Sequence, residues 1–310
     1  MNDNYYIKKI EELNLEIINL KNSKEYMSGQ KYINITKCLK SKNPVVVVNE
    51  LIKKYLNKKK AKQILRYNEY DEPNNDFMCD DIVKQKTKIV VYTCITGKYD
   101  KLIKPFLKLD NVDYVAFSDV ESDESNMWNV RKIPENVVKL EDNILINRYI
   151  KFHPAELLGD TYNYAIYVDG NISIISDLTE LINAINPKTG LAIHRHRQRN
   201  CSYKEVEVCK IVKKGNYDKM KEQLQRYKEE GFPENFGLYE ASVIASDLKN
   251  EKATNILDLW WNEFKCSESY RDQISLPYIV WKNKYDFNDI GSLGNNVYKN
   301  PKFRIEKHKK

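Results

Sequence analysis

The stretch Y-A-I-Y-V-D-G-N-I-S-I-I-S-D, residues 164–177, decides the fold. Its apolar run at 165–168 is typical of a buried strand, and Asp169, Gly170 and Asn171 follow directly. Because residues i and i+2 of a strand face the same side, Asp169 and Asn171 could both contact one bound cation. Gly170 between them would let a ligand approach the backbone closely. The alternative is that D-G-N is only the turn that ends the strand.

Strand and helix patterns alternate on both sides of this segment. Such alternation predicts an α/β fold, with a mostly parallel sheet flanked by helices. Ligands of such sheets bind at the carboxyl ends of the strands, where Thr93, Asp119 and Asp169 are expected to converge. The expected strands cover 89–93, 112–117, 165–168, 191–194 and 238–245, and the expected helices cover about 143–158, 178–185, 203–215, 217–230, 256–264 and 271–281.

The composition is that of a folded protein. With 310 residues, 42% hydrophobic content and 22 Tyr, the chain has enough apolar material for a core, which excludes global disorder. No window holds 18 uninterrupted apolar residues, and the start lacks the layout of a signal peptide, so a cytoplasmic location is expected. The six cysteines include no C-x-x-C pair. Buried thiols are therefore expected, with a Cys201–Cys209 bridge as the alternative.

Positive charge is concentrated at the N-terminus. Residues 1–70 hold 15 Lys and Arg against 7 Asp and Glu, a net charge of +8, whereas the whole chain carries +7. Apolar residues at helical spacing predict one helix over 7–20 and another between Pro44 and Ile64, and the polar stretch 71–86 is typical of a linker. We therefore expect two parts: a basic helical appendage with its linker at 1–86, and a main domain at 87–310.

The appendage could pack on the main domain, associate with a second copy, or contact the inner face of an anionic membrane as a peripheral protein. A solvated basic helix face is the simpler alternative. Because its basic residues lack interleaved stacking aromatics, no nucleic-acid partner is expected.

From about residue 88 to the end, the order of the pieces resembles the GT-A class of nucleotide-sugar glycosyltransferases. The segment Y-T-C-I-T-G-K-Y-D at 92–100 matches the strand and loop that hold the nucleotide, N-R-Y-I-K at 147–151 matches the basic helix, and D-G-N at 169–171 stands where that class has its D-x-D metal motif. The resemblance implies donor-binding residues at Thr93, Thr96, Tyr99, Asp119, Arg148, Lys151 and Asp169.

The same resemblance implies a divalent cation, Mn²⁺ or Mg²⁺, held by Asp169 and Asn171. Asn171 departs from the pattern, because an amide can offer an oxygen but removes one negative charge. A His near the C-terminus is often the third ligand in the class, and His308 fits by position. The alternative for His308 is a frayed basic tail. Arg148 and Lys151, at i and i+3 of one helix, would grip phosphate or pair with Asp119.

Later motifs narrow the resemblance. G-L-Y-E-A-S-V-I at 237–244 and R-D-Q-I-S-L at 271–276 look like the retaining family that includes glycogenin and bacterial lipopolysaccharide galactosyltransferases. Five motifs in order, namely T-C-I-T-G-K-Y-D, N-R-x-x-K, D-G-N, H-R-H-x-x-R-x-C-x-Y-x-E and R-D-Q-x-S, together look like the TOD/MUCI-type glycosyltransferase-like domain of bacterial polysaccharide clusters and plant mucilage-related proteins.

Under this resemblance Asp272 and Gln273 reach the reacting sugar, although Asp272 could instead be a helix cap. Glu240, among apolar strand residues, is expected to be a buried acid with a raised pKa or a partner of Arg271. A role on the acceptor or sugar side is assigned to the candidates of the histidine-rich motif, with a structural polar loop as the alternative: His194, His196 and Arg199.

The sequence thus predicts a metal-dependent glycosyltransferase. It would move a sugar from a nucleoside diphosphate sugar, with a UDP-sugar favoured, to a glycan or lipid-linked acceptor in surface polysaccharide synthesis, and the resemblance implies retention of configuration. One alternative is a sugar nucleotidyltransferase, although T-G-K at 96–98 is a meagre phosphate loop. The other is a non-catalytic binding protein that keeps the fold without the second carboxylate.

Overall fold

The computed structural model describes residues 3–41, 46, 49–53, 55–57, 87–97, 99–107, 109, 111–119 and 127–307. The expected linker at 71–86 and the candidate metal ligand His308 lie outside these residues. Of the second expected N-terminal helix, the described residues are helical. The division of the chain at residue 86 stays a prediction.

Seven strands form the central sheet. Their order is β3-β2-β1-β4-β7-β6-β8, and neighbours pair in parallel except β7, which is antiparallel to both β4 and β6. The expected fold class, a mostly parallel α/β sheet flanked by helices, is confirmed. Because β7 is reversed, its beginning meets the carboxyl ends of β1 and β4. The strands are β1 (Ile89–Ile95), β2 (Val112–Ser118), β3 (Asn129–Arg131), β4 (Tyr164–Val168), β6 (Leu191–Arg195), β7 (Tyr239–Asp247) and β8 (Gly291–Ser292).

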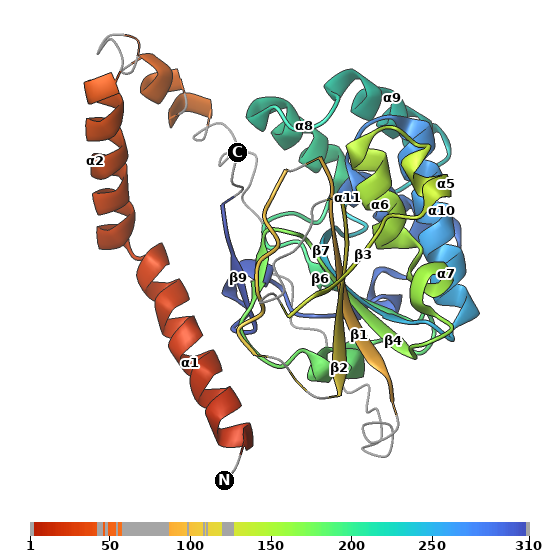
Figure 1. The fold of residues 1–310 in the computed structure, drawn as a ribbon. Coiled ribbons are helices and arrows are strands. Elements are labelled where there is room, and N and C mark those ends of the chain that lie inside the picture. Colours follow the sequence, from red (N-terminus) through yellow and green to blue (C-terminus); the bar gives the residue numbers. More distant parts are fainter. Residues whose placement is uncertain are drawn as a thin grey trace.

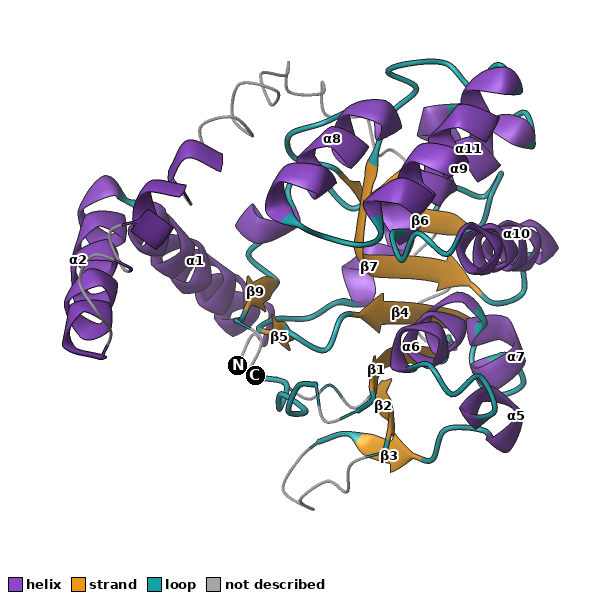
Figure 2. Cartoon of the chain, turned by 90° about the horizontal axis from the view of Figure 1, so that it is seen from above, coloured by secondary structure: helices purple, strands orange, loops and turns teal. Residues whose placement is uncertain are grey.

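Alternating side chains of the strands pack into two cores. Val90 and Tyr92 of β1 face a layer of helices, whereas Ile89 and Val91 face the opposite layer. That opposite layer contains the short helix η1 (Thr179–Ala184). It also contains a two-stranded sheet of β5 (Ile172–Ile174) and β9 (Phe303–Ile305) (Figure 2). The helix layer is built from α5 (Glu135–Val138), α6 (Asn143–Phe152), α7 (Pro154–Leu158), α8 (Ser202–Val212), α9 (Tyr217–Glu229), α10 (Glu251–Ser267) and α11 (Asp272–Lys282).

The expectation of a single helix at 143–158 is wrong in one respect, because this stretch forms two helices, α6 and α7. Pro154 has no N–H to donate and its ring crowds the preceding turn, so α6 ends before it and α7 begins at Pro154.

The helix expected at 178–185 is also different, because η1 is a 3₁₀ helix over Thr179–Ala184. The Asp177 carboxylate accepts bonds from the Thr179 backbone N–H at 2.7 Å and from its hydroxyl at 2.9 Å. This short-range pairing tightens the turn at once, instead of capping a regular α-helix.

Cysteine behaves largely as expected. Within the described part of the chain, Cys94, Cys201 and Cys209 are free and buried, so the Cys201–Cys209 bridge is not formed, while Cys266 is exposed.

Helix α1 (Asp3–Asn22) packs against β9, and α2 (Lys24–Ser41) continues beyond it (Figure 1). The contact centres on Asn14, which is 1% exposed. Its Nδ2 donates to the Pro301 and Phe303 carbonyls at 2.7 and 3.1 Å, and its Oδ1 accepts from the Arg304 guanidinium at 2.8 Å. Every polar group of this buried amide is thereby paired, so α1 of the appendage packs on the main domain.

Replacing Asn14 with alanine should detach α1. The change leaves two buried carbonyls and a guanidinium without this partner, at a cost of about 1–3 kcal/mol. Amide hydrogen exchange in α1 should therefore become faster, by about tenfold or more. Asn19, exposed on the same helix, provides the matched control Asn19→Ala. Equal exchange in both variants would contradict the latch role of Asn14.

Candidate active site

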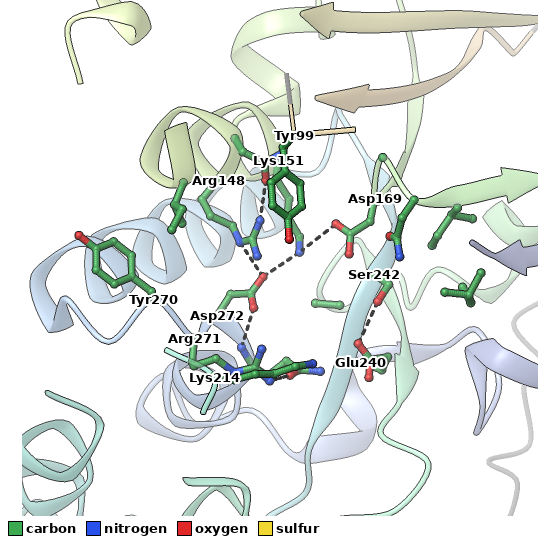
Figure 3. A pocket seen from close by; sticks show the side chains of 18 of the residues that line it. Tyr99, Arg148, Lys151, Asp169, Lys214, Glu240, Ser242, Tyr270, Arg271 and Asp272 are labelled. Carbon is green, nitrogen blue, oxygen red and sulfur yellow. Dashed lines mark hydrogen bonds and ion pairs between the residues drawn. The ribbon is translucent and has the colours of Figure 1, made fainter. Parts of the chain in front are cut away.

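A cavity of about 730 Å³ opens at the edge of the sheet where β1 and β4 end. Its walls come from the β1 loop, α6, the residues after β4, the start of β7, α8 and the start of α11. Its size is that of a small-molecule site, and it lies where parallel sheets bind ligands. Figure 3 shows charged side chains from these separate elements gathering around it.

Asp169 lies at the floor of the cavity, directly after β4. Its backbone N–H donates to the Ser242 carbonyl of β7 at 2.9 Å, and its side chain is 30% exposed. At Gly170 an added Cβ would lie 2.9 Å from Ile95 Cγ1, so a side chain there would force the Ile95 side chain to shift. Glycine therefore lets the D-G-N segment pack closely against Ile95 of β1.

Asn171 is fixed by the residue that follows β9. Its backbone oxygen accepts from the Glu306 N–H at 2.8 Å, and its Nδ2 donates to the Glu306 carbonyl at 3.2 Å. A carbonyl oxygen can only accept, so the NH₂ group must face Glu306 and Oδ1 is left for the cavity. An aspartate would place a carboxylate oxygen against that carbonyl. Asparagine can pair with Glu306 and still offer an oxygen to a ligand.

A buried ion cluster joins α6 to the start of α11. Arg148 Nε and Lys151 Nζ lie 2.9 and 2.8 Å from Asp272 Oδ2, and Lys151 Nζ lies 4.0 Å from Asp169 Oδ1 (Figure 3). Burial alone would raise the pKa of Asp272, but Arg148 and Lys151 outweigh it and hold that pKa well below its ordinary value. Asp272 is therefore a permanent carboxylate that positions both cations.

The position of α6 follows from local contacts. The Asp142 carboxylate caps the helix by accepting from the N–H groups of Ile144 and Leu145 at 2.6 and 3.0 Å. Asn147 Nδ2 donates to the Cys94 carbonyl of β1 at 2.8 Å. These bonds fix the helix face that presents Arg148 and Lys151 to the cavity.

A second buried cluster lies at the α8 side of the cavity. Glu205 Oε1 is 2.8 Å from Arg271 Nη2, and Glu205 Oε2 accepts from Arg199 Nε. Burial would raise the pKa of Glu205, yet the two guanidinium groups lower it to about 2. Arg271 also donates to Gln273 Oε1, which ties the side chain of Gln273 to this cluster.

Glu240 is a carboxyl of the cavity wall with a raised pKa. Burial is the main cause, partly opposed by the Ser242 hydroxyl, which donates to Glu240 Oε1 at 2.9 Å. Of the two expectations for Glu240, the raised pKa stays a prediction that its partial burial favours, whereas Arg271 pairs with Glu205 instead. His196 Nε2 lies 4.0 Å from Glu240 Oε2, and burial lowers the pKa of His196 to about 3, so this imidazole is neutral.

Residues 154–304, just under half of the chain, match the family model of the TOD1/MUCI70, glycosyltransferase-like domain. This segment is a glycosyltransferase-like domain. It contains Asp169, Asn171, Glu240 and the start of α11, while β1 and α6 precede it.

No curated protein matches the chain. Among solved structures, the apo structure of the bifunctional glycosyltransferase WbbM is 14% identical, with a TM-score of 0.41. The alignment covers 67% of this chain and 39% of that one, so the present chain spans about two-fifths of WbbM.

The glycosyltransferase-like domain and the elements before it bring most of the predicted site residues to one cavity. On its wall lie Thr96, Tyr99, Arg148, Lys151, Asp169, Asn171, His196, Arg199, Glu240, Asp272 and Gln273. Their individual roles stay predictions.

Three predicted residues are not part of the described wall. Thr93 lies inside β1, which extends two residues further than expected, so its side chain is buried within the sheet. Asp119 follows β2 and accepts from the Gly97 N–H at 2.7 Å, so the expected pairing of Arg148 and Lys151 with Asp119 is wrong. His194 lies within β6, whereas His196 follows the end of that strand, and His194 Nε2 contacts Asn300 Nδ2 at 3.2 Å.

Sequence reasoning missed the charged partners of the α8 side. Glu205 closes the histidine-rich motif and Arg271 precedes the Asp-Gln pair, yet their pairing joins residues far apart in the chain. The spacing of Arg199 and Glu205 around a helix start was the available signal. Cavity-lining residues without a local signal are Arg197, Lys214 and Tyr298.

The side chains at the floor of the cavity have the ligand chemistry that a divalent cation needs. Asp169 and the free side of Asn171 offer two oxygens, which Mg²⁺ and Mn²⁺ prefer. Within the described residues, no group of three His, Cys, Asp or Glu could hold a metal ion. Two protein oxygens suit a cation that takes its other ligands from substrate phosphates and water.

Proposed function

We propose that the chain is a metal-dependent glycosyltransferase that uses a nucleoside diphosphate sugar, with a UDP-sugar favoured, and a glycan or lipid-linked acceptor in surface polysaccharide synthesis. One observation carries the proposal: the oxygens of Asp169 and Asn171 and the cations Arg148 and Lys151 line one cavity at the carboxyl ends of β1 and β4. This arrangement suits a diphosphate that is shared between a metal ion and fixed cations.

The chemical need is to stabilise the departing diphosphate. A bound divalent cation would supply Lewis-acid charge there. Arg148 and Lys151 add positive charge that Asp272 holds in place, so it requires little reorganisation as the glycosidic bond breaks. Gln273 and Asp272 begin α11 at the same wall, in keeping with their expected contact with the donor sugar. Retention of configuration rests on the resemblance of this Asp-Gln pair.

Glu240 is the residue that best suits proton transfer. Its raised pKa and its bond from Ser242 distinguish it from Asp272 and Glu205, which stay ionised beside their cations. A carboxyl whose pKa approaches the working pH is the more effective general base. We assign it the proton of the attacking acceptor hydroxyl.

The alternative of a non-catalytic relic is weakened by the geometry of Asn171. Its amide is the one side chain of that shape that can donate to the Glu306 carbonyl while it offers an oxygen to the cavity. The contact with Glu306 therefore explains why asparagine replaces the second carboxylate without requiring that activity has been lost.

Wild-type protein should bind a nucleoside diphosphate in a metal-dependent way. Isothermal titration calorimetry with UDP, GDP and CDP, each with and without Mn²⁺, checks this. We expect one nucleotide to bind at least about tenfold more tightly with Mn²⁺, because Asp169 and Asn171 would hold a cation whose charge offsets that of the phosphates. A nucleotidyltransferase would instead bind the corresponding triphosphate and sugar phosphate more tightly. Lack of binding in all arms would overturn the proposed function.

The proposal also concerns the exposed surface of the N-terminal appendage. No described helix is long and apolar enough to cross a bilayer. Along α1 and α2 the large apolar side chains of Leu13, Leu20, Tyr32 and Ile33 are exposed. Peripheral contact with the inner face of a membrane, in a cytoplasmic protein, and self-association through residues 1–86 remain the two proposals for this surface.

A further inference from the structure

The two ion clusters of the cavity differ in their charge balance. On the α6 side, Arg148 and Lys151 face two carboxylates, Asp272 and Asp169. On the α8 side, Arg199 and Arg271 share the single carboxylate of Glu205. The second cluster therefore carries one net positive charge.

That extra charge is poorly solvated. The side chains of Glu205, Arg199 and Arg271 are 3%, 8% and 17% exposed. An uncompensated charge in such surroundings is costly, and an anion that enters the cavity would offset this cost. Arg271 Nε is moreover a buried donor without a hydrogen-bond partner among the described residues. The cluster thus has an N–H group available to donate a hydrogen bond to an oxygen atom of a ligand.

Two further cations line the same side. Lys214 precedes Gly215, where an added Cβ would lie 2.9 Å from Arg271 Cγ, so this turn packs directly on Arg271 (Figure 3). The guanidinium of Arg197 lies 4.2 Å from the ring centre of Tyr298, which also lines the cavity. Across the part of the chain that the structure describes, neither Lys214 nor Arg197 has a carboxylate within ion-pair distance.

The α8 side of the cavity has two carboxyl groups, those of Glu205 and Glu240. Its four cations are Arg197, Arg199, Lys214 and Arg271. Arg271 and Asp272 are consecutive, yet Arg271 contacts Glu205 whereas Asp272 contacts Arg148 and Lys151. The start of α11 therefore separates the two clusters. A donor sugar whose diphosphate lies by Asp169 would have the α8 side beyond it, where an acceptor approaches.

We propose that the α8 side is an anion subsite, formed by Arg197, Arg199, Lys214 and Arg271, that takes a phosphate or carboxylate group of the acceptor. The identification of the ligand as the glycosyl acceptor rests on the proposed function, whereas the presence of an anion site does not. A lipid-linked phosphate and an acidic sugar carry the same oxyanion chemistry, which guanidinium and ammonium groups bind through charge-assisted hydrogen bonds.

The test is calorimetry with glucose 6-phosphate, glucuronate and glucose, on protein with and without saturating UDP and Mg²⁺. One or both anionic sugars should bind more tightly than glucose, and the stronger one identifies phosphate or carboxylate as the group. Lys214→Met and Arg197→Gln should each weaken that binding about tenfold, as expected for one charge-assisted bond. Lys213→Met, at an exposed neighbour that does not line the cavity, is the matched control and should bind as wild type does.

The outcomes separate the two proposals. UDP binding that is unchanged in all variants, together with anion binding that needs Lys214, supports both. Anion binding that needs Lys214 in a protein that binds no nucleotide supports the subsite and overturns the proposed function. Equal affinity for glucose and both anions, or equal loss in Lys213→Met and Lys214→Met, overturns the subsite.

Discussion

Asp169→Ala should abolish the metal dependence of nucleotide binding and lower kcat/KM for donor-sugar hydrolysis by at least about 100-fold. The loss in kcat/KM should be this large because a catalytic cation supplies several kcal/mol of charge stabilisation, and each 1.36 kcal/mol changes the rate about tenfold. Asp169 is the one carboxylate of the D-G-N segment, so no neighbouring group there can replace it. Calorimetry with the preferred nucleotide, with and without Mn²⁺, measures the first effect, and release of free sugar measures the second.

The variant is expected to stay folded. Lys151 loses a partner at 4.0 Å but keeps Asp272 at 2.8 Å, and the backbone bond of residue 169 to Ser242 does not involve the side chain. Asp160→Ala removes an exposed carboxylate from the loop before β4, outside the cavity wall, and should leave binding unchanged. If Asp169→Ala retained the wild-type response to Mn²⁺, the metal site proposed here would be refuted.

The sheet could be predicted because its signals are local. The apolar runs that begin at Ile89, Val112 and Ala165 are long enough to be strands, and each is followed by polar residues that mark its end. The class of fold follows from such runs alternating with amphipathic helices. Thr93 was misplaced because Cys94 and Ile95 are also compatible with a strand, and pairing of β1 with β2 extends through Ile95.

The composition of the cavity could be predicted only in part. Asp169 and Asn171 are two residues apart, so strand geometry alone joins them. Arg148 and Asp272 are 124 positions apart, and no spacing rule connects them before the start of α11 is placed beside α6. Family resemblance supplied the candidates, whereas the pairing itself depends on tertiary packing.

The role of Asn171 shows what the structure adds. In the sequence this residue was a missing carboxylate and an argument for lost activity. The contact with Glu306 depends on the strand pairing of β5 with β9, between segments more than a hundred residues apart. Only that pairing shows that the position requires a donor as well as an oxygen.

Asp272→Asn should be the most destabilising substitution of the cavity. It keeps the size of the side chain but leaves the buried Lys151 and the partly buried Arg148 around a neutral group, and loss of one member of a buried ion cluster costs about 3–5 kcal/mol. Urea denaturation near neutral pH measures the free energy of unfolding. Glu222→Ala, which breaks the exposed Lys219–Glu222 pair on α9, is the control and should leave stability unchanged within error.

The pH dependence of the same variant has a defined sign. The pKa of Asp272 is lowered in the folded protein, so its contribution is present above its unfolded pKa of about 3.9 and is lost as the pH falls towards the folded value. The stability gap between wild type and Asp272→Asn should therefore be constant down to about pH 5 and narrow below about pH 4. A gap that widened in acid would contradict this account.

A double-mutant cycle with Lys151→Met separates charge from packing. Once Lys151 is removed, Asp272 keeps Arg148 as an ion-pair partner but has less positive charge to balance, so Asp272→Asn should cost less in the Lys151→Met background than in wild type. The expected coupling is about 1–3 kcal/mol. Additive single effects would show that Asp272 acts through the shape of the α11 start, where the Trp260 Nε1–H donates to its backbone oxygen at 2.9 Å, and not through its charge. Coupling of the expected size would instead mean that the cations which grip the donor are held in place by this one carboxylate.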